Sequence, residues 1–296
     1  GKETDETVQA VQEQITALPT AEQLAAMTDE QQQAVYEKLQ ATYAAYNALT
    51  DEQKVQITGA EKLDNLLAFF AGKTNALING VTYLDENGSE QTANNVTVIE
   101  SSMTTWSDGW YLVDSTLTID SRITVNGDVH LILADGENLT VNGGIGVAEN
   151  NRFTVYAQST EGNMGTLTAT GREYAAGIGS GENGSGGTVT INGGTVNASG
   201  GGGGAGIGGG FSASGGTTTI SGGNVTATGG RNAAGIGGGF NSSGGTITIS
   251  GGTVNANGGE DAAGIGGGMS GSGGTTTISG GNVTATGGRN AAGIGG

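Results

Sequence analysis

The chain has 296 residues, of which 61 are glycine, with one proline and no cysteine, and its formal net charge is −18. The negative charge argues against nucleic acid or an anionic membrane as a partner, because phosphates need a basic surface. The lack of cysteine excludes disulfides and thiolate metal sites. No apolar run in the sequence approaches the ~20 residues of a membrane span, so no span is expected in this chain.

Residues 1–72 contain few glycines and are rich in Ala, Gln, Glu and Leu. Three Thr-x-x-Gln sequences begin at Thr20, Thr28 and Thr50, and this pattern is typical of capping boxes at helix N-termini. Apolar residues recur at helical spacing between and after these sequences. The pattern predicts a small bundle of three main helices with short connections.

Residues 73–114 are expected to bridge this bundle and the repeats that follow. They contain strand-like pieces and both tryptophans of the chain, Trp106 and Trp110. If exposed, the two rings are candidates for stacking on sugars. We favour the alternative of an aromatic cap over the open end of a solenoid, whose first coil otherwise exposes apolar side chains and an unpaired edge.

A repeat with a period of 29 residues organises the rest of the chain. The sequence Ala-Gly-Ile-Gly returns with its isoleucine at Ile178, Ile207, Ile236, Ile265 and Ile294. Self-similarity at a fixed period of this length is typical of a stacked-repeat architecture.

One repeat, residues 217–240, contains three short segments, TTTIS, NVTAT and AAGIG, separated by glycine-rich corners. The first two alternate between apolar and polar residues and are rich in β-branched residues, as strands are. Ile220, Val225 and Ile236 then point inward and stack on the same residue types in the next repeat. The sequence predicts a mainly β protein, with a right-handed parallel β-helix of three strands per 29-residue coil over residues 115–296.

Other glycine-rich structures fit less well. A disordered linker would not keep its apolar residues in phase, and a calcium-binding β-roll needs an Asp in each glycine-rich turn. Because the chain stops in mid-repeat without a polar cap, further coils are expected to follow in the natural protein.

Charges alternate between repeats in one column. Arg231 and Arg289 occupy the position that Glu260 occupies in the repeat between them. Adjacent coils lie about 4.8 Å apart, so these side chains attract each other. We interpret the alternation as a stacking device.

The first candidate binding surface is an array of Thr-x-Thr pairs on successive coils. Its central members are Thr217, Thr219, Thr246 and Thr248. Threonine simply suits an exposed strand face, although a regular array of this kind also leaves ice binding as a minor alternative.

The second candidate surface is the column of Phe211, Phe240 and Met269, which follows a glycine-rich corner. If exposed, these side chains would contact glycans or a protein. If tucked under, which we favour, they would hold the corner together.

Polysaccharide cleavage is the main enzymatic alternative, and it needs clustered carboxylates. His130 lies between two apolar residues of an alternating strand, so we expect a solvated surface histidine. No nucleophile–base pair can be recognised, and no catalytic residue is assigned. Hard cations prefer oxygen-rich sites, which leaves calcium as the one cofactor with candidate ligands. The charged residues of the early coils are Asp114, Asp120, Asp128, Asp135, Glu137, Arg122 and His130.

The run WYLVDSTLTIDSRITVNGDVHLILADG, residues 110–136, is followed by GGTVTINGGTVNA and AAGIGGG units. With these motifs the chain resembles large Gly-rich repeat proteins on the surface of anaerobic gut bacteria, of the adhesin-like or carbohydrate-binding-like kind. LTDEQK, residues 49–54, is similar to a sequence in small helical modules of such proteins. The resemblance implies a secreted or cell-wall-attached protein and carries no established catalytic residues.

We therefore predict a non-enzymatic, monomeric, adhesin-like protein that presents a repetitive β-helix face to glycans or host surface proteins. The alternatives are a polysaccharide-degrading β-helix enzyme and a helical bundle that binds immunoglobulin or another host protein.

Overall fold

The computed structural model describes residues 2–72 and 77–296, which divide into two compact units, one up to Leu77 and one from Ile78 onward. The first unit is helical, and its fully buried centre is formed by Leu24, Leu39 and Leu66. None of the described helices is long and apolar enough to cross a membrane. The helices are α1 (Lys2–Ala17), α2 (Ala21–Ala25), α3 (Asp29–Asn47), α4 (Asp51–Lys54) and α5 (Glu61–Gly72).

All three predicted capping boxes are present in this helical unit. In each, the threonine hydroxyl accepts a hydrogen bond from the backbone of the glutamine three positions later, and the glutamine side chain accepts one in return. The boxes at Thr20 and Thr50 begin the short helices α2 and α4. The expected connections between three main helices are therefore partly helical, and the described unit has five helices.

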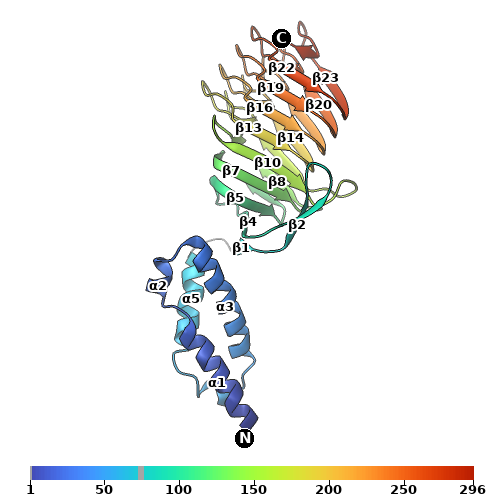
Figure 1. Ribbon diagram of the computed structural model, residues 1–296. Coiled ribbons are helices and arrows are strands. Elements are labelled where there is room, and N and C mark those ends of the chain that lie inside the picture. The colour runs from blue at the N-terminus through green and yellow to red at the C-terminus, as the bar shows by residue number, and fades with distance from the viewer. Residues whose placement is uncertain (1, 73–76) are drawn as a thin grey trace. The chain divides into compact units, whose positions relative to one another are not determined.

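The second unit is a solenoid of parallel strands that stack coil upon coil (Figure 1). Strand β5 pairs in parallel with both β4 and β7, so the stack begins before residue 115, where the sequence analysis placed its start. Part of the predicted bridge thus belongs to the solenoid, and another part forms the antiparallel hairpin of β2 and β3. The first strands are β1 (Leu77–Ile78), β2 (Val81–Leu84), β3 (Glu90–Ala93), β4 (Val96–Val98), β5 (Thr105–Val113), β6 (Leu117–Ile119), β7 (Ile123–Leu133), β8 (Asn138–Val141), β9 (Ile145–Gly146) and β10 (Arg152–Ala157).

The later coils are regular and have three strands each, as predicted. Two strands of each coil belong to a 15-stranded sheet, here called the large sheet, and one belongs to a 7-stranded sheet. The regular strands are β11 (Thr166–Thr170), β12 (Ile178–Gly179), β13 (Thr188–Ile191), β14 (Thr195–Ser199), β15 (Ile207–Gly208), β16 (Thr217–Ile220), β17 (Asn224–Thr228), β18 (Ile236–Gly237), β19 (Thr246–Ile249), β20 (Thr253–Asn257), β21 (Ile265–Gly266), β22 (Thr275–Ile278), β23 (Asn282–Thr286) and β24 (Ile294–Gly295).

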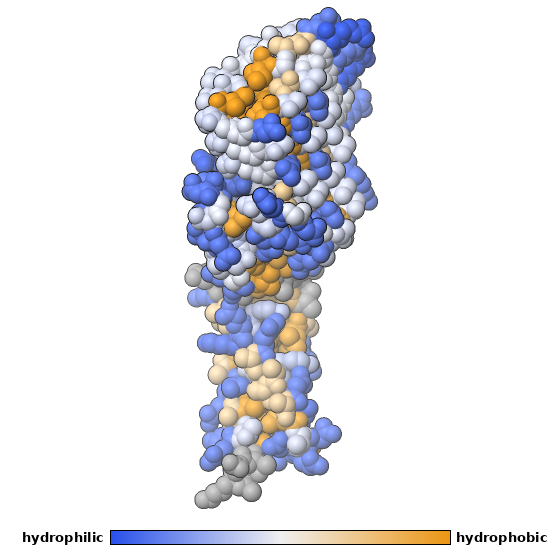
Figure 2. All heavy atoms as spheres, turned by 90° about the vertical axis from the view of Figure 1, so that its right-hand side faces the viewer, coloured by the Kyte–Doolittle hydropathy of each residue, from blue (hydrophilic) through white to orange (hydrophobic). Residues whose placement is uncertain are grey.

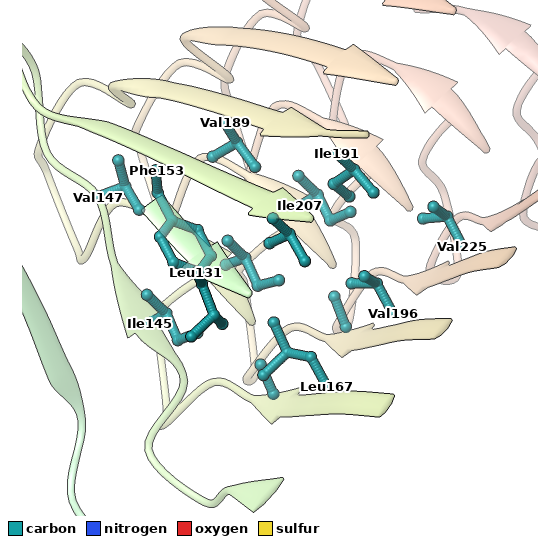
Figure 3. Packing of buried hydrophobic residues seen from close by; sticks show 14 of the residues in the cluster. Leu131, Ile145, Val147, Phe153, Leu167, Val189, Ile191, Val196, Ile207 and Val225 are labelled. Carbon is teal, nitrogen blue, oxygen red and sulfur yellow. The ribbon is translucent and has the colours of Figure 1, made fainter. Parts of the chain in front are cut away.

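Most of the interior of the regular coils consists of ladders of identical side chains, as the sequence predicts. Ile220 pairs with Ile249, Val225 with Val254, and Ile236 with Ile265. Figure 3 shows residues of this core, from Leu131 to Val225, which gather between the sheets. A ladder residue is sealed by the coils on both sides of it, since Ile249 is fully buried whereas Ile278 in the last coil is 41% exposed.

The glycine that follows the isoleucine in each Ala-Gly-Ile-Gly sequence is required for steric reasons, as Gly237 illustrates. Gly237 has a φ of +132°, which side chains rarely adopt. A Cβ at this position would also meet the carbonyl oxygen of Gly266 in the next coil. Backbones of successive coils therefore approach closely here, and only glycine fits.

Candidate functional site

The column of Phe211, Phe240 and Met269 is half-buried. The rings of Phe211 and Phe240 stack with centroids 5.0 Å apart and planes 21° apart, and Tyr174 packs its edge against Phe211 at 5.3 Å. The Phe211 ring also fills the space beside Gly203, where a Cβ would lie 2.6 Å from it. Because the stacking covers one face of each phenylalanine ring, less ring surface remains for a ligand. This geometry favours the corner-holding role over a platform for sugars.

The Thr-x-Thr array faces outward from the large sheet. Thr217 and Thr246 pair in register and are exposed, and Thr219 and Thr248 pair and are half-buried. Thr218, which lies between Thr217 and Thr219 in strand β16, points inward and is only 1% exposed. The array is thus a lattice of hydroxyl groups with rows about 4.8 Å apart.

The column of Thr217 and the column of Thr219 both continue into the early coils, where the residue types change. The first runs from Thr188 to Arg152 and Asp128. The second runs from Thr190 through Thr154 to His130 and Trp110. The outer face of the large sheet therefore carries hydroxyls along the regular coils and charged and aromatic groups at its beginning.

The two tryptophans lie on opposite sides of strand β5. A register shift between Ser107 and Gly109 reverses the alternation, so Trp106 points inward and Trp110 outward. Trp106 is fully buried, lies 6.0 Å from the Phe153 ring, and has an indole nitrogen with no hydrogen-bond partner among the described residues. Trp106 therefore has no exposed surface for a ligand, and the prediction that it binds one is wrong. Its place in the first coil fits the alternative, an aromatic cap.

Trp110 is half-buried within an aromatic cluster. Its ring stacks on His130 with centroids 4.5 Å apart and lies 4.7 Å from Tyr83 and 5.2 Å from Tyr156. Tyr83 belongs to the β2–β3 hairpin, which is tied to the solenoid by a hydrogen bond from Gln158 Nε2 to the carbonyl oxygen of Thr82. Because Trp110 packs against three other rings, little of its own ring remains for a sugar, which makes it a poor sugar platform.

His130 points outward, as predicted, but it is not a solvated surface histidine. Its side chain is 25% exposed beneath Trp110, with Nδ1 3.2 Å from the Tyr156 hydroxyl and Nε2 3.6 Å from Asp128 Oδ1. Burial raises the pKa of Tyr156 to about 12, with smaller contributions from Tyr83 and Asp128. The phenol therefore stays protonated and can donate to the imidazole. This cluster could not be predicted from the sequence, because its members lie on different strands and are distant from one another in the chain.

The acidic residues of the early coils lie apart from one another, with the exception of Asp108 and Asp128. Asp108 Oδ1 accepts a hydrogen bond from the backbone nitrogen of Asp128, which brings these two acids together. By contrast, Asp120 accepts from Asn142 and Asp135 from Ser159. The part of the chain that the structure describes contains no group of three or more His, Cys, Asp or Glu side chains that could hold a metal ion.

Arg122 ties together backbone carbonyls of the early coils. Its guanidinium donates to the carbonyl oxygens of Gly143, Ala176 and Gly179 at 2.8 to 3.0 Å. Burial, together with the nearby charge of Arg172, lowers the pKa of Arg122 to about 10. These contacts give Arg122 a structural role.

The alternating charges pair as predicted. Glu260 lies 3.5 Å from Arg231 and 3.8 Å from Arg289, one coil to either side. Asp261 accepts a hydrogen bond from Asn290 at 2.8 Å. The column therefore links three successive coils.

The outer face of the 7-stranded sheet is a surface that the sequence analysis did not single out. On β17 it presents Asn224, Thr226 and Thr228, and on β20 the opposite order of hydroxyl and amide groups, Thr253, Asn255 and Asn257. The alternation of NVTAT with TVNAN was the signal that could have revealed it.

Comparison with known proteins supports the repeat architecture. Residues 162–182, 189–211, 219–240, 247–269 and 277–296 match the family model Beta helix repeat. No curated protein and no solved structure matches the chain. The matched segments and the parallel strand pairing agree that the repeats of this chain are β-helix repeats, stacked into a parallel β-helix.

Proposed function

We propose that this chain is a non-enzymatic, adhesin-like part of a secreted or cell-wall-attached bacterial protein that binds glycans or host surface proteins through its coils. The observation that carries the proposal is the register of outward, uncharged side chains on both sheets, such as Thr217 on Thr246 and Asn224 on Thr253. A ligand with a repeating structure would meet the same groups on every coil. Many weak contacts then add through effective concentration.

The resemblance to Gly-rich surface proteins of gut bacteria also supports this proposal. β-Helix repeats occur in both enzymes and non-enzymes, so the repeat alone leaves the class open. The test is a screen of the full chain on a glycan array and on immobilised mucin, with release of reducing sugar ends followed in the same wells. We expect binding without release. Release of sugar ends would contradict a non-enzymatic role, and silence in both assays would direct attention to protein ligands of the helical unit.

Polysaccharide cleavage is the second candidate, because the Asp108 carboxylate lies against the backbone of another acidic residue, Asp128. Asp108 and Asp128 are neighbours, and His130 and Tyr156 extend this cluster. Glycoside cleavage uses two carboxyl groups as acid and base or nucleophile. If the screen shows release, Asp128→Asn should abolish it. Asp261→Asn, which changes a carboxylate of the regular coils, should leave it unchanged.

A further inference from the structure

The outer face of the 7-stranded sheet forms a regular array of uncharged polar groups, here called the amide–hydroxyl face. All its side chains on the regular coils are exposed or half-buried. None of them is charged, although the whole chain has a net charge of −18. The residues of the face are Thr166, Thr168, Thr170, Thr195, Asn197, Ser199, Asn224, Thr226, Thr228, Thr253, Asn255, Asn257, Asn282, Thr284 and Thr286.

Hydroxyl and amide groups alternate along the solenoid axis on this face. In the central column, Asn197 pairs with Thr226, Thr226 with Asn255, and Asn255 with Thr284. The outer columns alternate in the same way over the later coils, whereas three earlier pairs place hydroxyl on hydroxyl: Thr166 with Thr195, Thr170 with Ser199, and Ser199 with Thr228. Residues 217–238 and 275–296 are identical in sequence, so the chemical repeat of the solenoid is two coils. Two coils correspond to about 9.6 Å along the axis, twice the spacing of neighbouring strands.

The side view in Figure 2 agrees with a polar, weakly hydrophilic surface. The solenoid is mostly white, which marks intermediate hydropathy, and blue, with orange in small patches. A polyanion or polycation would find no charged partner on the amide–hydroxyl face. A neutral ligand rich in hydroxyl groups would find both donors and acceptors, since an Asn side chain supplies both and a Thr hydroxyl does as well.

We propose that the amide–hydroxyl face binds a neutral, extended, β-linked glycan that lies along the solenoid axis. In an extended β-1,4-linked chain successive sugars are turned over, so the chemical repeat is a disaccharide, and one sugar is comparable in length with one coil. One disaccharide then meets one two-coil repeat, and each sugar face meets the same pair of hydroxyl and amide groups. The proposal rests on the proposed function and adds the ligand class and the face that binds it.

The affinity of this face comes from hydrogen bonds repeated over several coils. No aromatic side chain belongs to the face, so stacking contributes nothing there. Each sugar is therefore bound weakly, and affinity must rise with the length of the glycan through effective concentration. This length dependence is itself measurable.

The test is calorimetric titration of the full chain with soluble β-linked oligosaccharides of glucose and, separately, of N-acetylglucosamine. An α-linked glucose oligomer, whose chain coils instead of extending, is the control ligand. The double variant Asn197→Thr, Asn255→Thr removes the alternation from the central column but keeps it neutral and rich in a good strand former. The double variant Thr226→Glu, Thr284→Glu adds charge to the same column. Thr219→Glu, Thr248→Glu makes the same change on the outer face of the large sheet, and Ser250→Glu, Ser279→Glu is the control at exposed positions outside both faces.

We expect at least one β-linked series to bind with an affinity that rises with length. Both variants of the amide–hydroxyl face should weaken binding by at least about tenfold, because contacts on several coils are lost together. The Ser250→Glu, Ser279→Glu control should bind as the wild type does, and circular dichroism should show all variants folded.

Two outcomes would overturn the inference without touching the proposed function. One is glycan or mucin binding that is lost in the Thr219→Glu, Thr248→Glu variant and kept in both variants of the amide–hydroxyl face. The other is binding on the array with no response to either β-linked series. Binding to no glycan and no host protein at all would overturn the proposed function itself.

Discussion

The irregular first coils and the regular later coils solve the same packing problem in different ways. In the first coils, large and unlike side chains such as Trp106, Leu131 and Phe153 fill the interior. In the regular coils, most inner positions pack on a copy of themselves, as Ile236 does on Ile265. In the repeats, side chains of neighbouring coils therefore fit together because they are the same. Where the repeat is broken, each side chain must fit a different neighbour.

The outer surfaces differ for the same reason. The regular coils present repeating hydroxyl and amide groups, and their charges serve mainly to link neighbouring coils. The aromatic cluster and the neighbouring pair Asp108 and Asp128 occur only where the repeat is broken. Repeated surface groups and irregular side-chain clusters thus occupy different ends of the solenoid, and four predictions test the difference in packing between these ends.

The largest effect is expected where the backbones of successive coils touch. Gly237→Val places a β-branched residue at a positive φ, and its Cβ would collide with the carbonyl oxygen of Gly266. We expect a loss of more than about 5 kcal/mol in the free energy of unfolding, beyond most single substitutions. Chemical denaturation followed by circular dichroism measures this loss. Gly181→Ala is the control, because a Cβ there meets nothing within 4 Å, and a small effect at Gly237 would show that the coils can separate easily.

The second effect concerns the fitted core of the first coils. Trp106→Ala removes a fully buried ring, so we expect a loss of about 3–5 kcal/mol in the same measurement. Ile236→Val, a small change in a regular ladder, should cost only about 0.5–1.5 kcal/mol. Equal costs for the two variants would argue against the distinction between fitted and repeated packing.

The third effect is a gain in stability. The hydroxyl of Thr218 is buried without a hydrogen-bond partner among the described residues, while Val189 and Ile247 occupy the same position in the neighbouring coils. Thr218→Val restores an apolar ladder and should raise the thermal midpoint, with a gain of about 1 kcal/mol. Thr219→Val, which changes the adjacent outward threonine, should stay within about 0.5 kcal/mol of the wild type. A destabilised Thr218→Val protein would mean that the hydroxyl has a buried partner such as water.

The smallest effect belongs to the charge column. Glu260→Gln removes the partner of Arg231 and Arg289, but the pair is solvent-exposed, so the loss should be under about 1 kcal/mol. The difference from the wild type should shrink in about 1 M salt, where the screening length falls to about 3 Å. A difference that persists at high salt would show that Glu260 acts through packing and not through charge.

Sequence periodicity alone determined the architecture of this protein. The 29-residue period and the alternation of β-branched residues predicted the coils, the inner ladders and the paired charges, because each coil contacts mainly copies of itself. The capping boxes likewise marked helix beginnings, since they depend only on residues three positions apart.

Tertiary structure decided what happens where the period fails. A bulge in β5 places Trp106 inside and Trp110 outside, although regular alternation would put both on one face. The hairpin that carries Tyr83 covers Trp110, and Trp110 in turn covers His130, through contacts between residues distant in sequence. Such contacts follow from which strands become neighbours in space, and no local pattern in the sequence encodes that choice.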